Sequence, residues 1–275
     1  MIISSTGNPQ IKAIRKLRDR KYREETNTFY IEGIRIVREV ISDPQRIKTL
    51  IVSPELLQSD SAAAALKEII GKGIPVLEVS QSVFASFALK DHPQGLAAIV
   101  RPVWNSLADL DVHSMGLWVG LDSVADPGNL GTIMRTLDAV SAKGIFLIDA
   151  CTDPYDPAAV RGSMGALFSL DLVKVTTEEL IRWKKVNSVF ACGTSDGAHA
   201  NYQEVDYPAN MILLMGSERQ GLHPELASCC DEMVAIPMAG RSDSLNLAVA
   251  TGVMLYEIYN QHRKRRCDCF VGRDR

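Results

Sequence analysis

The sequence contains no apolar run that approaches the roughly 20 residues needed to span a bilayer. Its N-terminal segment, MIISSTGNPQIKAIRKLRDRK, also lacks the apolar stretch of a secretory signal. We therefore expect a cytoplasmic protein that has no membrane partner.

Cysteines are few and scattered, so a disulfide framework is not expected. The six positions are Cys151, Cys192, Cys229, Cys230, Cys267 and Cys269. The last two form a Cys-x-Cys pair, but no other cysteine pair or histidine cluster nearby completes the four ligands of a structural zinc site. We expect reduced thiols and no bound metal.

An overall excess of positive charge is also missing, because the net charge is −3. The 46% hydrophobic and 23% charged residues are typical of a folded globular protein, and 275 residues favour two domains over one. Positive charge is nevertheless concentrated in two clusters. These are Lys12, Arg15, Lys16, Arg18, Arg20, Lys21 and Arg23, and then Arg263, Lys264, Arg265 and Arg266. Each cluster can be a solvated helix end, but the pair favours contacts with a phosphate backbone.

Hydrophobic periodicity divides the chain into a small and a larger α/β region. Residues 1–102 alternate helical patterns, including 33–41 and 62–70, with short buried strands at 50–52, 76–79 and 96–100. Residues 103–114 are typical of a linker, and 267–275 form a C-terminal tail. Within 115–266 we predict strands at 117–121, 144–148, 189–192, 211–215 and 233–236, with helices at 130–142, 177–186 and 245–259. This alternation predicts a mostly parallel sheet with helices on both faces.

Several common nucleotide and hydrolase motifs are absent. The sequence has no Gly-x-Gly-x-x-Gly dinucleotide fingerprint, no Gly-x4-Gly-Lys-[Ser/Thr] phosphate loop and no Gly-x-Ser-x-Gly elbow. Three other polar loops follow predicted strands instead, at 122–135, 216–221 and 236–246. Taken singly, their glycines can serve tight turns and their Asn, Ser and Asp residues can cap helices. Three such loops on one parallel sheet favour a ligand site at the carboxyl ends of the strands.

These loops resemble the three signature motifs of the SpoU/TrmH methyltransferases. The matching patterns are Asn129-x-Gly131-x3-Arg135, Gly216-Ser-Glu218-x2-Gly221 and Ile236-Pro-Met-x5-Ser244-Leu-Asn246-x3-Ala250. Arg161-Gly-Ser-Met-Gly-Ala-Leu-Phe168 is similar to another segment of that family. In the first hundred residues, Asn8-Pro-x-Ile-Lys12, Phe29-Tyr-Ile-Glu-Gly33 and Pro93-Gln-Gly95 resemble the family's substrate-binding domain.

The resemblance implies an α/β fold of the SPOUT type, in which a trefoil-knotted parallel sheet carries helices on both faces. A smaller N-terminal α/β sandwich domain would bind RNA. The family uses S-adenosylmethionine and usually works as a homodimer. Carried over from the family, the residues at the cofactor would be Gly216, Ile236, Met238 and Leu245, with Thr194 and Ser195 beside them. Ile236 and Leu245 can equally be plain core residues. Leu245, Val249, Gly252 and Tyr256 are spaced as one helix face, packed either in the core or against a second subunit.

The implied reaction methylates a ribose 2′-oxygen of RNA, and Arg135 leads the catalytic set. A guanidinium is normally always charged, so either Arg135 is unusually deprotonated and acts as the base, or it orients the hydroxyl and a phosphate. We prefer the second interpretation. Asn129, Asn246 and Ser244 would position the ribose and Arg135, and Glu218 would hold Arg135 in one rotamer.

The substrate is expected to be ribosomal RNA, because an N-terminal domain of this type is similar to those of ribosomal RNA methylases. Two alternatives stay open: a transfer RNA 2′-O-methyltransferase, and a non-catalytic RNA-binding protein that keeps the methyltransferase fold. A DNA partner is not expected. The role of Cys267 and Cys269 has no explanation in the sequence.

Overall fold

The computed structural model describes residues 2–57 and 73–271, with side chains described up to Arg265. The predicted helix over 62–70 and the side chains of Cys267 and Cys269 lie outside the described residues. Contacts divide the chain into two compact units. The first unit is Met1–Val103 with Asp153–Phe168, and the second is Trp104–Thr152 with Ser169–Arg275.

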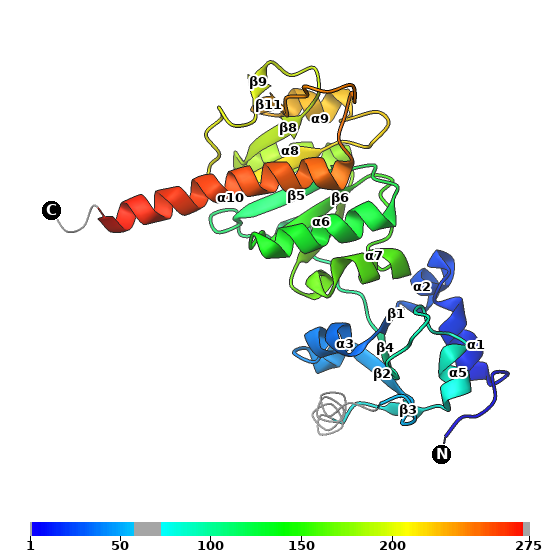
Figure 1. Ribbon diagram of the computed structural model, residues 1–275. Coiled ribbons are helices and arrows are strands. Elements are labelled where there is room, and N and C mark those ends of the chain that lie inside the picture. Colours follow the sequence, from blue (N-terminus) through cyan, green and yellow to red (C-terminus); the bar gives the residue numbers. More distant parts are fainter. Residues whose placement is uncertain (1, 58–72, 272–275) are drawn as a thin grey trace. The chain divides into compact units, whose positions relative to one another are not determined.

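The first unit is built on a four-stranded mixed sheet (Figure 1). Its order is β1 (Phe29–Glu32), β4 (Leu96–Val100), β2 (Ile47–Val52) and β3 (Val76–Glu78). Strand β4 runs antiparallel to both of its neighbours, and β3 is parallel to β2. The strands predicted at 50–52, 76–79 and 96–100 are therefore confirmed, although β3 was predicted to be buried and is exposed at Val76 and Glu78. Strand β1 entered the sequence analysis only as part of a family-like segment.

Helices cover both faces of this sheet. They are α1 (Pro9–Lys16), α2 (Arg20–Thr26), α3 (Ile34–Val40), the 3-10 turn η1 (Pro44–Arg46) and α5 (Gln81–Ala85). The apolar residues Ile11 and Phe84, from α1 and α5, pack in one cluster with Tyr30 of β1. Side chains alternate along a strand, so Phe29 lies on the opposite face, where its ring meets that of Tyr155 at 4.6 Å. The segment Asp153–Phe168, called the inserted segment below, contributes α7 (Pro157–Ser163) and η3 (Ala166–Phe168). Helix α7 contacts β1.

The second unit contains a seven-stranded sheet in which every pairing is parallel. Its order is β7 (Asp171–Val175), β6 (Gly144–Ile148), β5 (Leu117–Asp122), β10 (Met211–Met215), β8 (Phe190–Thr194), β11 (Glu232–Ala235) and β9 (Ala200–Asn201). The predicted parallel sheet is confirmed, with boundaries shifted by one or two residues at β5, β8 and β11. Strands β7 and β9 were not predicted.

Two pairs of helices flank this sheet. In Figure 1, α6 (Pro127–Ala139) and α10 (Leu247–Val271) lie side by side, and they pack against each other. Helices α8 (Thr177–Asn187) and α9 (Pro224–Cys229) also contact each other. Leu180 of α8 and Leu226 of α9 share a core cluster with Trp118 and Phe146, whose rings stack at 4.6 Å. The unit also contains the short turn η2 (Leu107–Asp109).

The order of the strands determines where a ligand site can form. Strands β6 and β7 lie on one side of β5, while β10, β8, β11 and β9 lie on the other. Chain direction across the sheet therefore reverses at β5 and β10, and such a switch point is where open α/β sheets bind ligands. The loops after β5, β10, β8 and β11 leave from one edge of the sheet, since parallel strands end together. Within the described ranges no helix is both long and apolar enough to cross a membrane.

Candidate active site

The loop after β5 leads directly into α6, and the local sequence explains the sharp start of that helix. Asp126 is the N-cap, and its side chain accepts a hydrogen bond from Gly128 N at 2.7 Å. Pro127 occupies the first helical position, where its missing N–H costs nothing. Helix α6 therefore begins three residues before the predicted start. As a result Asn129 lies in its first turn, at the edge where the other loops arrive.

Asn129 connects all three motif loops by its carboxamide. Its Nδ2 donates to Glu218 Oε1 at 2.6 Å, and its Oδ1 accepts from Asn246 Nδ2 at 3.0 Å. Asn246 in turn caps α10, since its Oδ1 accepts from the N–H groups of Ala248 and Val249 at 3.0 and 3.3 Å. Residues 89 and 117 positions away are thus held on one amide.

Arg135 lies farther along α6 and is exposed. We expected Glu218 to hold its guanidinium, but within residues 2–57 and 73–271 no hydrogen bond or ion pair joins the two. The Glu218 carboxylate binds the Asn129 amide instead, because Asn129 in the first turn lies closer to that loop. Arg135 is exposed, so a phosphate or ribose oxygen can reach its guanidinium.

The second motif forms a tight loop closed by its own backbone. Ser217 and Gly221 exchange two hydrogen bonds, of 3.1 and 3.0 Å, and Gly221 has a φ of +66°. A Cβ added to Gly216 would lie 2.0 Å from the backbone carbon of Gly221 and 2.1 Å from Leu222 N. Only glycine fits at position 216, because the returning chain occupies the place of a side chain.

The predicted cofactor residues lie on the loops that leave the adjacent strands β10, β8 and β11. Thr194 ends β8, and its hydroxyl donates to Met215 Sδ at 3.5 Å, while Ser195 N donates to the carbonyl of Val234 at 3.0 Å. Ile236 is half-buried, and Met238 and Leu245 are 40% and 36% exposed. These apolar side chains are incompletely covered at the edge of the sheet where the strands end. Ser244 is exposed on the same loop.

A carboxylate–imidazole pair that the sequence analysis missed lies at the end of β5. Asp122 is fully buried and accepts hydrogen bonds from His223 N at 2.8 Å and from the His223 ring, whose Nδ1 lies 2.9 Å from Oδ1. The hydrogen bond to Asp122, together with its charge, raises the pKa of His223. No local signal could have found a pair separated by 101 residues. It fixes the chain that follows the second motif to the strand that precedes the first.

The basic cluster of the first unit divides into exposed and buried members. Lys12, Lys16, Arg18, Arg20 and Lys21 are exposed, and Arg15 is half-buried.

Arg23 differs from the rest, because its side chain is only 4% exposed and bonds Asp153 at 2.8 Å and Asp156 at 3.4 Å. It also donates to the carbonyls of Leu17 and Arg18. Every strong donor of Arg23 is used inside the unit, so this residue is withdrawn from the predicted RNA-contacting set.

The fold and these loops define an α/β enzyme of the methyltransferase type, with its site at the switch point of a parallel sheet. Residues 116–256 match the SpoU rRNA Methylase family, and residues 8–98 match the MRM3-like substrate binding domain. The chain belongs to the SpoU rRNA methylase family.

Relatives and solved structures are similar over nearly the whole chain. The 23S rRNA (guanosine(2553)-2'-O)-methyltransferase RlmP of Bacillus subtilis is 30% identical over 93% of this chain and 98% of its own. An AdoMet-bound rRNA methyltransferase structure from Sinorhizobium meliloti is 37% identical, with a TM-score of 0.85 over 94% of this chain and 97% of that one. The SpoU methyltransferase AviRb of Streptomyces viridochromogenes, also solved with AdoMet, is 27% identical with a TM-score of 0.83 over 93% and 98% of the two chains.

Proposed function

We propose that this protein is an S-adenosylmethionine-dependent methyltransferase that methylates a ribose 2′-oxygen of ribosomal RNA. The observation that carries the proposal is the Glu218–Asn129–Asn246 network, which joins the three family motifs at the switch point of the sheet. The relatives support the substrate, since they are named as 2′-O-methyltransferases of 23S ribosomal RNA and match this chain over nearly their full lengths.

The residues at the strand ends fit S-adenosylmethionine chemically. The partly exposed Ile236, Met238 and Leu245 offer apolar contacts for a flat adenine ring. Gly216 allows another segment of backbone to approach closely, so backbone polar groups rather than a side chain line that position. Thr194 and Ser195 supply hydroxyls at the next strand end. When bound, the cofactor supplies a methyl group on a cationic sulfonium.

The residues of the chain then have distinct tasks. In our proposal Arg135 orients the ribose hydroxyl and a neighbouring phosphate and stabilises the developing alkoxide, while water or another group accepts the proton. Asn129 and Asn246 each spend one N–H and their carbonyl oxygen on the network, which leaves one amide N–H each for the ribose. Ser244 offers a hydroxyl from the same loop. Asn129, Asn246 and Glu218 are therefore proposed chiefly to hold the loops in register.

Further features of the proposal follow from the family resemblance. We propose a homodimer that uses the exposed apolar face of α10, where Val249 and Tyr256 are 53% and 49% exposed. The family resemblance is also the basis for proposing a trefoil knot in the C-terminal part of the chain. It is likewise the basis for proposing a cytoplasmic location. We propose that residues 1–102, together with 153–168 of the same unit, bind RNA, and that 115–266 otherwise carry the chemistry.

The test is methyl transfer from labelled S-adenosylmethionine to total unmodified RNA, with wild type, Arg135→Ala and Arg182→Ala side by side. We expect label at a ribose 2′-oxygen of ribosomal RNA, and a loss of at least about 100-fold in kcat for Arg135→Ala, in line with removal of a donor to developing charge. Its calorimetric affinity for the cofactor should be unchanged. Arg182 forms an exposed ion pair with Glu178 on α8, so its loss should leave transfer unaltered.

Each other outcome contradicts a definite part of the proposal. Near wild-type transfer by Arg135→Ala would remove that residue from the catalytic set. Label in transfer RNA instead would overturn the ribosomal substrate. A wild-type chain that neither transfers methyl groups nor binds the cofactor would leave a non-catalytic RNA-binding protein.

A further inference from the structure

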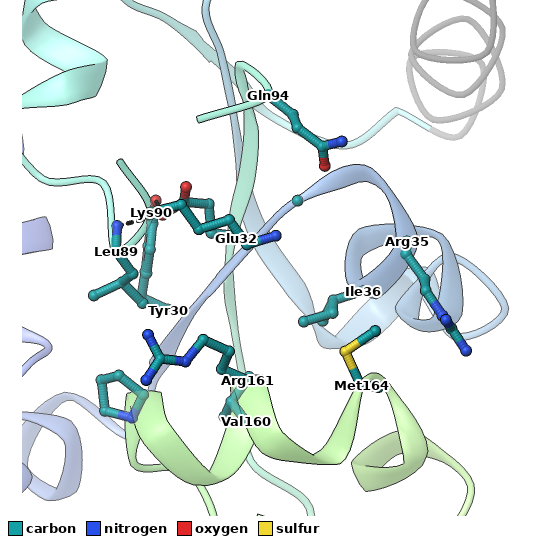
Figure 2. Close-up of a pocket in the computed structure, with 12 residues that line it drawn as sticks. Tyr30, Glu32, Arg35, Ile36, Leu89, Lys90, Gln94, Val160, Arg161 and Met164 are labelled. Atoms are coloured by element: carbon teal, nitrogen blue, oxygen red, sulfur yellow. Dashed lines mark hydrogen bonds between the residues drawn. The ribbon is translucent and has the colours of Figure 1, made fainter. Parts of the chain in front are cut away.

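A cavity of about 100 Å³ opens in the first unit, and all of its lining residues belong to that unit (Figure 2). Its walls are mostly apolar, with Ile36 from α3 and Val160 and Met164 from the inserted segment. Its volume corresponds to roughly seven to ten water-sized positions. This is room for the ring of one nucleobase, and too little for a folded peptide element.

A buried carboxylate lines this cavity with one oxygen unused. Glu32 is 4% exposed, and its Oε2 accepts from Leu89 N at 2.6 Å and from the Tyr30 hydroxyl at 3.2 Å. Its Oε1 is buried and has no hydrogen-bond partner. Burial raises the pKa of Glu32, while the Leu89 N–H and the charges of Lys90 and Arg18 oppose that rise. A buried acceptor without a donor is costly, so this oxygen is suited to an N–H group that arrives with a ligand.

Positive charge surrounds the mouth of the cavity. Lys90, Arg35 and Arg161 all line it and all are exposed. Lys90 lies over the backbone next to the carboxylate, since a Cβ added to Gly33 would be 3.1 Å from Lys90 Nζ. Gly33 has a φ of +105°, a backbone conformation that favours glycine. Apolar walls inside and cations outside match a base and its phosphate.

Three separate segments with no role in the methyl-transfer site converge on this cavity. Strand β1 brings Tyr30 and Glu32 and is followed at once by Gly33, the turn before β4 brings Gln94, and α7 brings Arg161. The same segments, around Phe29–Gly33, Pro93–Gly95 and Arg161–Phe168, resembled family segments in the sequence analysis, but no role was assigned there to their individual side chains. Gln94 Oε1 accepts from Ile34 N at 3.3 Å and so ties the turn to the start of α3. The cavity is thus a built feature of the unit.

We propose that this cavity binds one unpaired nucleotide of the substrate RNA, distinct from the nucleotide that is methylated. The base enters between Ile36, Val160 and Met164 and donates an N–H from its Watson–Crick edge to Glu32 Oε1. The adjoining phosphates contact Lys90, Arg161 and Arg35. Unpaired bases are the usual target of sequence-specific RNA recognition, because their edges are free. The proposal rests on the proposed function, whose substrate it narrows to an RNA that carries an extruded base in addition to the nucleotide that is methylated.

The experiment is a scan of the methylated RNA fragment with single abasic sites, using the full-length protein. For wild type, we expect one abasic position outside the methylated nucleotide to raise KM by about 10-fold or more, as loss of a hydrogen bond to a charged group predicts. Glu32→Gln should raise KM for the intact RNA by a similar factor and abolish the extra penalty at that one position. Its kcat at saturating RNA and its cofactor affinity should stay at wild-type values.

Glu25→Gln is the matched control, because Glu25 lies in the same unit with a side chain 57% exposed, and it should behave as wild type. Lys90→Ala is a second variant at an exposed position. This variant should weaken binding to RNA of every sequence. It should also reduce the slope of log K for RNA binding against log salt concentration by about 1.

Three results would overturn the proposal. One is a Glu32→Gln variant that keeps the wild-type KM for RNA. A Glu32→Gln variant with a raised KM that still responds to every abasic site as wild type does would also overturn it, because that result marks a purely structural role. The third is Lys90→Ala with unchanged affinity and salt dependence. If the wild-type protein transfers no methyl group, the proposed function is wrong but the cavity can still be tested. The abasic scan then measures the affinity of the protein for each RNA instead of KM.

Discussion

At the scale of single residues, Asn129 shows why an amide differs from a carboxylate at this site. It donates to Glu218 and accepts from Asn246 at once, a combination that only an amide side chain of this length provides. Asn129→Asp replaces the donor with a second carboxylate oxygen 2.6 Å from Glu218. We expect kcat/KM for RNA methylation to fall by about 10- to 100-fold, the loss associated with one charged hydrogen bond.

Asn201→Asp is the control for that measurement, because Asn201 uses its side-chain oxygen to accept from Gln203 N, and aspartate keeps that oxygen. Equal kcat/KM values for Asn129→Asp and Asn201→Asp would show that the network does not position the loops.

Arg23 shows at the same scale that the role of a residue depends on its burial. Its guanidinium is enclosed by Asp153, Asp156 and two carbonyls, so Arg23→Ala leaves buried and partly buried acceptors without donors. We expect a loss of about 3 kcal/mol in the free energy of unfolding of this unit, from denaturant titration. Arg20→Ala, three residues earlier, removes an exposed pair with Glu24 and should cost only about 0.3–0.5 kcal/mol. Similar losses for the two variants would refute the distinction.

The sequence could predict the residues of this site, but not which of them meet. Three ordered motifs identified Asn129, Glu218 and Asn246, because residue type and spacing are local. Their mutual hydrogen bonds depend on how loops 89 and 117 residues apart converge, which no spacing encodes. The same reason explains Arg23, whose neighbours in sequence are exposed cations and whose partners lie 130 and 133 residues away.

At the scale of elements, continuous apolar runs made the central strands of the second unit easy to predict, whereas β1, which is also fully buried, was not predicted as a strand. Strands β5, β6 and β10 are buried at every position, so their apolar runs were clear. Strand β7 was missed because Asp171 and Lys174 are exposed and interrupt the apolar pattern. Helix α10 was predicted at 245–259 but begins at Leu247, after the Asn246 cap, and extends to Val271. No glycine or proline follows Gly252 within that span to end it.

The loop from Gly216 to Gly221 offers a prediction at this scale. In Gly216→Ala the new methyl group would lie 2.0 Å from the Gly221 backbone, so the whole loop must move. Because backbone there cannot yield as a flexible side chain would, we expect cofactor affinity to fall by at least about 10-fold in calorimetry, the equivalent of roughly 1.4 kcal/mol.

Gly240→Ala is the matched change in the neighbouring loop, where a Cβ meets nothing within 4 Å. That variant should bind the cofactor within about two-fold of wild type, a difference near the 0.4 kcal/mol that such a ratio represents. If Gly216→Ala also binds normally, the second motif does not border the cofactor.

At the scale of the whole molecule, the two units divide the work that the proposals assign. The parallel sheet of the second unit gathers the methyl-transfer loops at its switch point. The first unit carries the exposed cations of α1 and α2 and the cavity lined by Glu32. Segment Asp153–Phe168 lies between two strands of the second unit in sequence yet belongs to the first by its contacts. The chain therefore passes between the units three times.

The exposed face of α10 provides the test of the proposed homodimer. Val249 and Tyr256 lie seven residues apart, two helical turns, and both project apolar surface into solvent from a helix that packs against the helix of Arg135. In a symmetric dimer each residue of the interface occurs twice, so one introduced charge places two like charges in a desolvated contact. We expect wild type to sediment at about twice its 30.2 kDa and Val249→Asp at the monomer mass.

Val186→Asp makes the same change on α8 at a residue that is 77% exposed, and it should leave the dimer intact. A dimeric Val249→Asp would move the interface to another surface, and a monomeric wild type would remove the homodimer from the proposal altogether.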